Sequence, residues 1–409
     1  MHARRALIDR TAPILLLCTL LAVAPRARVS ADVADVDALI AAAFTAAYNL
    51  DQDAAITNAR AAVAAGPDVS RAHRALASVL WLRALFLRGA VTVDHYMGGL
   101  TKSQIILPKP PPDIEAEFRH AVTRAIDLAD AAHRRDRRDL AALHDLGTAQ
   151  GLQASWTASV DGRVMAAFGA ARKAFDAEET VLNRDPRNVG AGTVVGTYRY
   201  AVASLGIASR MVAYLAGFGG DKARAMSLLE AAGRQGDSRF EARTALVLIY
   251  SREGRHADAY ALLGQMAAEF PRNRILVLEQ GAAAIRAGRA PEAEALLTRG
   301  LAAFDQDSRW KIPGERALWL YKRGLARLNQ NHQEMAAADF TRALGAAPEP
   351  WVQGRIHLEL GKLADLAGQR TAAIARYRTA RDMGRSANDP LGVADADRLL
   401  RQPFSMGSD

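Results

Sequence analysis

Three groups of side chains have residue types that do chemistry in other proteins, and none has the required spacing. The glycine-rich stretch GFGGDK at 217–222 resembles a phosphate-binding loop. However, Asp221 separates its last glycine from Lys222, and Ala223 stands where a Walker loop requires Ser or Thr. A glycine stop for one helix, followed by Asp221 as the N-cap of the next helix, explains the same residues.

The histidines and carboxylates show no catalytic or metal-binding motif. The nine histidines form no i, i+4 pair and no HExxH motif, and no Gly-x-Ser-x-Gly nucleophile elbow occurs. Neighbouring carboxylates such as Glu178 and Glu179 fall within helical patterns, where we expect solvated faces. The single cysteine, Cys18, excludes a cysteine-based zinc or iron–sulfur site. We therefore predict no catalytic residue, no cofactor and no metal site.

One set of basic and polar side chains has a spacing that suits binding. Its members lie on predicted helices of the C-terminal half: Arg252, Arg286, Tyr321, Asn329, Arg355 and Lys362. Arg252, Arg286 and Asn329 each stand two residues before a turn glycine or asparagine. A column of this composition on a concave surface suits an acidic peptide or a carboxylate tail. The alternative is a solvated basic groove without a partner.

The helices that carry this column repeat with a period of 34 residues. Adding 34 to Val247, Gly254, Ala259 and Leu263 gives Gly281, Gly288, Ala293 and Leu297. A small residue lets the first helix of a unit approach the second, a glycine turns the chain, and an alanine lies where the helices cross. Two further units turn at Asn331 and Gly368, and the segment 305–315 absorbs nine extra residues between units.

This pattern resembles the tetratricopeptide repeat. The resemblance implies an all-α fold, a right-handed superhelical solenoid of helical hairpins, with four repeats in 237–386 and a capping helix and tail in 387–409. The carboxylate clamp of chaperone adaptors with these repeats pairs Lys and Asn on one helix. Thr244 and Leu248 stand at those places, so we do not expect that clamp.

Residues 32–236 are predicted to continue the array with longer, irregular hairpins. We expect helices at 35–48, 54–65, 70–89, 113–135, 140–159, 163–183, 194–215 and 221–232. Residues 197–236 are similar to a segment of the tetratricopeptide-repeat-39 family and of its exported bacterial relatives. The matching residues are Tyr198, Tyr200, Gly217, Phe218, Gly220, Asp221, Leu228, Leu229 and Ala232. This resemblance implies a helical scaffold with no catalytic residues to transfer.

An insertion at 89–112 interrupts one of these hairpins. Loops of this length are uncommon in compact arrays unless they are functional or disordered. Asp94, His95 and Tyr96 lie at its centre, and its proline-rich end at 108–112 is expected to be extended and stiff. One hypothesis is a flap over the concave face that contacts a partner. The alternative is a loop packed along the edge of the solenoid.

Residues 1–31 have the order of a secretory signal peptide. Arg4, Arg5 and Arg10 precede an apolar run at 12–24 that is too short to span a bilayer, and small residues end at Ala31. Cleavage after Ala31 would remove Cys18 and lower the net charge from +9 to +5. We predict a periplasmic or secreted protein, soluble after cleavage and without a transmembrane helix.

The remaining charge does not favour nucleic acid as a partner. Basic residues are spread over the repeats, and two aspartates dilute the basic cluster at 133–139. The predicted function is a non-enzymatic scaffold or adaptor that binds a protein or peptide on its concave face, and the basic column favours an acidic one. A different class, a solute-handling accessory protein, would enclose a small ligand beside Trp81, Trp156 or Tyr198. A hydrolase with a non-sequential active site is a third, weaker interpretation. The partner, the pathway and the oligomeric state stay open.

Overall fold

The structure is a computed structural model that describes residues 33–97, 107–204, 219–236 and 238–407. In these ranges it has eighteen α-helices and no strand, so the predicted all-α class is confirmed. The N-terminal half contains α1(Val33–Tyr48), α2(Gln52–Ala65), α3(Ser70–Leu87), α4(Asp94–Met97), α5(Pro112–Arg135), α6(Leu140–Ser159), α7(Val164–Arg184), α8(Val189–Ala203) and α10(Lys222–Arg234). The C-terminal half contains α11(Arg239–Arg252), α12(His256–Glu269), α13(Arg274–Arg286), α14(Ala290–Gln306), α15(Glu315–Asn329), α16(Gln333–Leu344), α17(Pro350–Leu366), α18(Arg370–Ala387) and α19(Pro390–Arg401).

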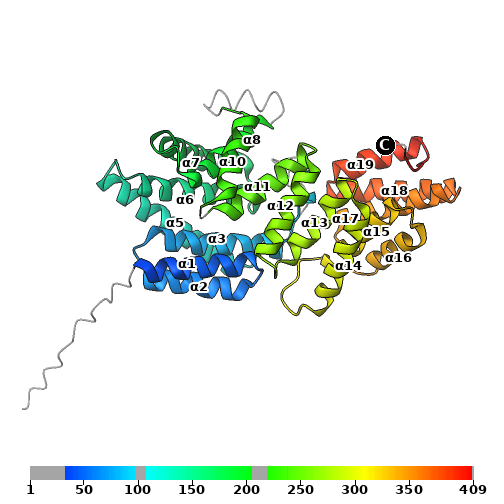
Figure 1. Cartoon of the computed structure of the whole chain (residues 1–409), viewed down its shortest axis with the longest axis horizontal. Helices are drawn as coiled ribbons and strands as arrows, with labels where there is room; N and C mark the ends of the chain where they lie inside the picture. The colour runs from blue at the N-terminus through cyan, green and yellow to red at the C-terminus, as the bar shows by residue number, and fades with distance from the viewer. Residues whose placement is uncertain (1–32, 98–106, 205–218, 237, 408–409) are drawn as a thin grey trace, which may run out of the picture.

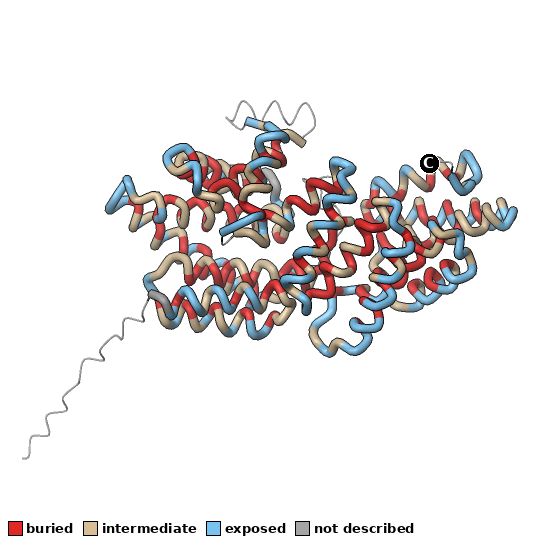
Figure 2. Tube along the Cα trace, viewed as in Figure 1, coloured by how far each residue is buried: buried red, intermediate tan, exposed pale blue. Residues whose placement is uncertain are grey.

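The helices form a single array of hairpins in chain order (Figure 1). The pairs are α1/α2, α3/α5, α6/α7, α8/α10, α11/α12, α13/α14, α15/α16 and α17/α18, with α19 as a final helix on α18. Buried residues follow the facing sides of these helices along the whole array (Figure 2). The solenoid prediction is therefore confirmed. The predicted signal peptide and residues 205–215, the second half of the helix expected at 194–215, lie outside the described residues.

Glycines in the C-terminal repeats let paired helices approach closely. A Cβ on Gly281 would lie 2.6 Å from Cγ of Leu297, and one on Gly324 would lie 2.5 Å from the Phe340 ring. The turn positions Gly254 and Gly288 have φ near +74°, a left-handed conformation that glycine adopts at little cost. Asn331 takes the same role with a φ of 59°, because asparagine tolerates this region.

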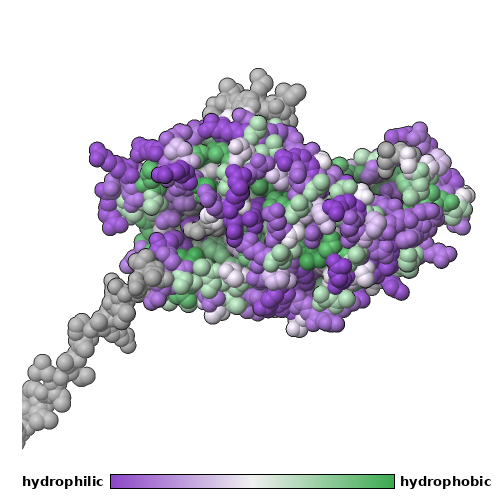
Figure 3. All heavy atoms as spheres, in the orientation of Figure 1, coloured by the Kyte–Doolittle hydropathy of each residue, from purple (hydrophilic) through white to green (hydrophobic). Residues whose placement is uncertain are grey.

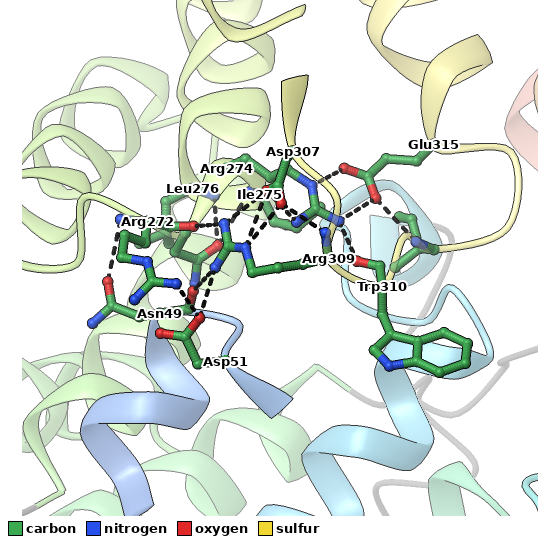
Figure 4. A network of polar contacts seen from close by, with 12 residues as sticks. Asn49, Asp51, Arg272, Arg274, Ile275, Leu276, Asp307, Arg309, Trp310 and Glu315 are labelled. Atoms are coloured by element: carbon green, nitrogen blue, oxygen red, sulfur yellow. Dashed lines mark hydrogen bonds and ion pairs between the residues drawn. The ribbon is translucent and has the colours of Figure 1, made fainter. Parts of the chain in front are cut away.

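The N-terminal hairpin packs against the C-terminal repeats, which the repeat pattern alone does not predict. The Tyr48 ring stacks on Phe240 with centroids 3.8 Å apart and meets Phe270 edge-on. Polar contacts continue this interface (Figure 4): Asp51 accepts hydrogen bonds from Arg272 at 2.7 Å and Arg309 at 3.2 Å. This closure carries the C-terminal end of α3 into the C-terminal half, where Phe86 joins its hydrophobic core.

Candidate functional site

The chain that leaves α3 crosses the first helices of the four C-terminal repeats, the concave side of such an array. Gly89 has a φ of +74°, a backbone conformation that favours glycine. A Cβ there would also lie 2.6 Å from Oε1 of Glu349, so the available space requires glycine as well. The Tyr96 hydroxyl donates to the Ala90 carbonyl at 2.9 Å and braces the short helix α4. Residues 89–97 are called the inserted segment below.

Asp94 is the centre of the contact between the inserted segment and the repeats. Its side chain is buried, and its carboxylate accepts hydrogen bonds from Nη2 of Arg286 at 2.7 Å and from Nζ of Lys322 at 2.5 Å. Nη1 of Arg355 lies 3.7 Å from the same carboxylate. Three helices, α13, α15 and α17, thus direct a cation at one carboxylate that an element more than 190 residues earlier supplies.

The surrounding charges balance when Asp94 is counted. Glu279 lies 3.6 Å from Lys322, and Asp389 accepts hydrogen bonds from Arg355 at 2.7 and 3.0 Å. Burial by itself would raise the pKa of the Asp94 carboxyl, but the three cations together hold this pKa well below its ordinary value. The carboxyl therefore stays ionised in the site.

The rest of the inserted segment makes directional contacts on both sides of Asp94. Nη1 of Arg252 donates to the Tyr96 carbonyl at 2.8 Å, and the Val93 amide donates to Glu279 at 3.3 Å. His95 lies edge-on to Trp351 with ring centroids 5.2 Å apart, and its Nε2 is 3.5 Å from Glu349. Backbone and side-chain groups of the segment are therefore recognised as those of a bound peptide would be.

The structure brings together two sets of residues that the sequence presented separately. Of the basic column, Arg252, Arg286 and Arg355 contact the inserted segment, which carries Asp94, His95 and Tyr96. Of the other three members, Tyr321 lies beside Lys322 on α15 and close enough to Arg355 and Asp94 to feel their charges. Tyr321 is buried, and burial raises the pKa of its hydroxyl above the ordinary range. Asn329 is exposed at the end of α15, and Lys362 donates to Glu359 at 2.9 Å.

The sequence analysis did not identify three charged residues that are buried beneath the basic column. Lys322 and Glu279 are buried in this site, and Glu359 is buried in the next repeat. All three occupy one slot, nine residues before the turn positions Asn331, Gly288 and Gly368, on first helices of their hairpins. A charged residue recurring at a core-facing slot is the signal that would have found them.

Glu178 corrects the expectation that the Glu178–Glu179 pair forms a solvated face. Its side chain is fully buried, and one oxygen lies 2.8 Å from Nδ1 of His144. Burial raises the pKa of this carboxyl above its ordinary value. Gly147 makes room for the Glu178 side chain, because a Cβ at position 147 would lie 2.5 Å from the carboxylate. The pair was misassigned because an acidic residue on a helix is usually exposed.

The aromatic residues considered for a small-ligand pocket pack into two hydrophobic clusters, one of which holds both Trp81 and Trp156. Trp156 stacks on Phe118 with ring centroids 3.9 Å apart, and Trp81 donates to Ser159 at 3.1 Å. Tyr198 packs against a different hydrophobic cluster. A hollow of about 430 Å³ between α5, α6 and α7 is lined by other residues, namely Thr123, Ile126, Gln150, Gln153, Ala166, Gly169, Ala170 and Lys173. These aromatic residues therefore do not support the solute-handling alternative.

Metal-binding clusters and membrane-spanning helices are both absent from the described ranges. Within those ranges, His, Asp and Glu side chains form no group of three or more that could hold a metal ion. No helix among them is both long and apolar enough to cross a bilayer.

The fold and the site define a helical-repeat protein with a peptide-like segment in its concave face. Residues 250–312 match the family model of the tetratricopeptide repeat, and the chain thus contains tetratricopeptide repeats, as the 34-residue period predicts. The relation to the tetratricopeptide-repeat-39 family stays a prediction. No curated protein matches the chain.

Several solved structures match the chain at low identity and with TM-scores below 0.5. Yeast Tom70 has 10% identity and a TM-score of 0.39, with 90% of this chain and 89% of that chain covered. A tetratricopeptide repeat protein from Parabacteroides merdae has 14% identity and a TM-score of 0.30, with 79% and 97% covered. A thermophilic protein with these repeats from Thermus thermophilus has 19% identity and a TM-score of 0.22, with 59% and 92% covered.

Proposed function

We propose that this protein is a non-enzymatic scaffold that binds an acidic segment of a partner protein on the concave face of its four C-terminal repeats. One observation carries the proposal: the site holds a carboxylate, Asp94, between Arg286, Lys322 and Arg355. The inserted segment occupies the place of the partner. A partner would displace it and supply an equivalent carboxylate.

The surface chemistry supports a polar mode of recognition. On the face drawn in Figure 3, hydrophilic side chains predominate and hydrophobic ones appear in small separated patches. Arginine forks recognise carboxylates through paired, charge-assisted hydrogen bonds, which gives specificity for acidic segments. Partner selection on this protein would therefore depend on charge and hydrogen bonding.

A synthetic peptide of residues 90–97 tests the proposal directly. We expect a variant lacking residues 91–110 to bind the labelled peptide in fluorescence anisotropy. The full chain should bind it more weakly, because its own segment competes at a high effective concentration. The matched control is the same peptide with Asp94→Asn, which should bind roughly tenfold to hundredfold more weakly.

Two further variants guard against misleading outcomes. If the deletion variant does not fold, the full chain with Asp94→Asn serves instead, because its own segment then competes poorly. Charge reversal of Arg252 and Arg286 belongs in the deletion background, since Arg286 contacts Asp94 in the full chain. Equal binding of the Asp and Asn peptides would refute the proposal.

The proposal includes export to the periplasm or beyond the cell. Its support is the order of basic, apolar and small residues in 1–31. N-terminal sequencing of the protein from an envelope fraction should begin after Ala31. A mature chain that begins with Met1 would contradict it.

A further inference from the structure

The segment 307–314 between α14 and α15 presents an exposed tryptophan on a fixed backbone. Trp310 is 56% exposed, the highest value among the exposed large hydrophobic residues of the described ranges. Its carbonyl accepts a hydrogen bond from Arg274 at 2.6 Å, and Arg274 is itself held by Glu315 and Asp307. In Figure 4 the indole points away from this network. The network therefore fixes the backbone of Trp310 and leaves its ring uncovered and free to turn.

Arg83, on α3, lies against this ring. Its guanidinium carbon is 4.9 Å from the Trp310 ring centroid, and the residue is only 7% exposed. Neither Nε nor Nη1 has a hydrogen-bond partner, and both are buried. The nearest carboxylate, Asp53, is 3.7 Å from Nη2 and remains 80% exposed, too distant for a hydrogen bond.

An arrangement of this kind is costly unless a ligand completes it. A guanidinium carries five N–H donors, and burying them without acceptors is strongly unfavourable. Tryptophan and arginine are also the residue types most enriched where binding energy concentrates at protein interfaces.

We propose that Arg83 and Trp310 form a second docking point, which takes a side-chain carboxylate of a partner protein. The carboxylate accepts the N–H groups of Arg83 that have no partner. Since Nε and Nη1 are covered in the free protein, the Trp310 ring must move aside as the carboxylate enters. The nearby Asp53 favours a monoanionic carboxylate over a phosphate dianion, because it repels the second negative charge more strongly. This site is independent of the Asp94 site.

The fluorescence of Trp310 reports on this step. We would titrate the full chain with N-acetylglutamate amide at millimolar concentrations and subtract the signal of the Trp310→Phe variant, which removes the contribution of the other tryptophans. The glutamine analogue and inorganic phosphate are the comparison ligands. We expect a saturable change with the glutamate compound, and a response at least roughly tenfold weaker with its glutamine analogue.

Arg83→Met separates a binding role from a structural one. Removing an unsatisfied buried cation should leave the melting temperature unchanged or raise it by about 2–4 °C, while the fluorescence response is lost. The matched control, Arg60→Met, removes an exposed arginine and should keep the response. The proposal is overturned by any of three results. These are the absence of a saturable response, a response that survives Arg83→Met, and a stronger response to phosphate or glutamine than to glutamate.

Discussion

Replacing Asp94 with Asn should release the inserted segment from the concave face. The substitution keeps the size of the side chain but removes the only negative charge that the segment gives to Arg286, Lys322 and Arg355. Glu279 and Asp389 remain, so the site changes from three cations with three anions to three cations with two. The buried excess positive charge then opposes closure.

The expected loss follows from the burial of these groups. Removing one partner of a buried ion pair costs about 3–5 kcal/mol, because the remaining charge is left uncompensated. This is a large part of a typical unfolding free energy of about 5–15 kcal/mol. If the loss falls on the inserted segment alone, its amides should exchange hydrogen roughly a hundredfold or more faster.

Hydrogen exchange followed by mass spectrometry measures the segment, and urea unfolding followed by circular dichroism measures the whole chain. Asp37→Asn is the matched control, because Asp37 pairs with Arg71 at 2.7 Å while its side chain is 54% exposed. This control should cost no more than about 1 kcal/mol. Adding Arg286→Met to Asp94→Asn leaves Lys322 paired with Glu279 and Arg355 paired with Asp389, and should recover about 0.5–3 kcal/mol.

A small effect would refute this reasoning. If Asp94→Asn costs no more than the Asp37 control, and exchange in residues 89–97 is unchanged, the buried charges do not hold the segment. If the double variant is less stable than the sum of its single changes, the charge balance described here is wrong.

Three further predictions concern the Asp94 site, the packing within the repeats and the interface between the N-terminal hairpin and the C-terminal repeats. Because the pKa of Asp94 is lowered in the folded state, its stabilising contribution should be complete above about pH 3.9 and lost as the pH falls below that value. The difference in melting temperature between the full chain and its Asp94→Asn variant should therefore be the same at pH 7 and pH 5 and should shrink below about pH 3.9. Gly324→Ala should cost about 1–3 kcal/mol in urea unfolding, since its Cβ would lie 2.5 Å from Phe340, whereas Gly169→Ala in α7, with open space around it, should stabilise slightly. Tyr48→Ala removes the stack on Phe240 and should cost about 3–5 kcal/mol, while Phe168→Ala, on a different cluster, should leave exchange at residues 49–51 unchanged.

Local pattern predicted the hairpins well because each depends on neighbours in the sequence. The slot shared by Val247 and Gly281 lies against the second helix of the same unit, so a 34-residue period is enough to identify it. Boundaries followed for the same reason: α6 begins and ends at Leu140 and Ser159, as the apolar stripe predicts. Asp221 caps α10 through a 2.9 Å hydrogen bond from the Arg224 amide, as the sequence indicates.

The site was predicted only in part because it depends on contacts between distant residues. Asp94 and Lys322 are 228 positions apart, and no periodicity in the chain relates one to the other. The insertion and the basic column each stood out by length or spacing, yet nothing local shows that they meet. Lys322 itself is adjacent to Tyr321, and a long basic side chain on an amphipathic helix ordinarily extends into solvent.

Closure of the array explains why the concave face needs a carboxylate. In an open solenoid, water would solvate Glu279 and Lys322 on the first helices of their repeats. Here the packing of Tyr48 against Phe240 brings α3 and the inserted segment over these groups and buries them. Their charges then require partners within the protein.

The buried charged groups determine which charge a molecule must carry to replace the inserted segment. Without Asp94, the groups around Lys322 carry one positive charge more than they can pair. A neutral peptide would leave that charge buried, and a strongly acidic one would reverse the imbalance. A competitor therefore has to bring one carboxylate to Arg286 and one backbone carbonyl to Arg252, the two groups that Asp94 and Tyr96 now provide.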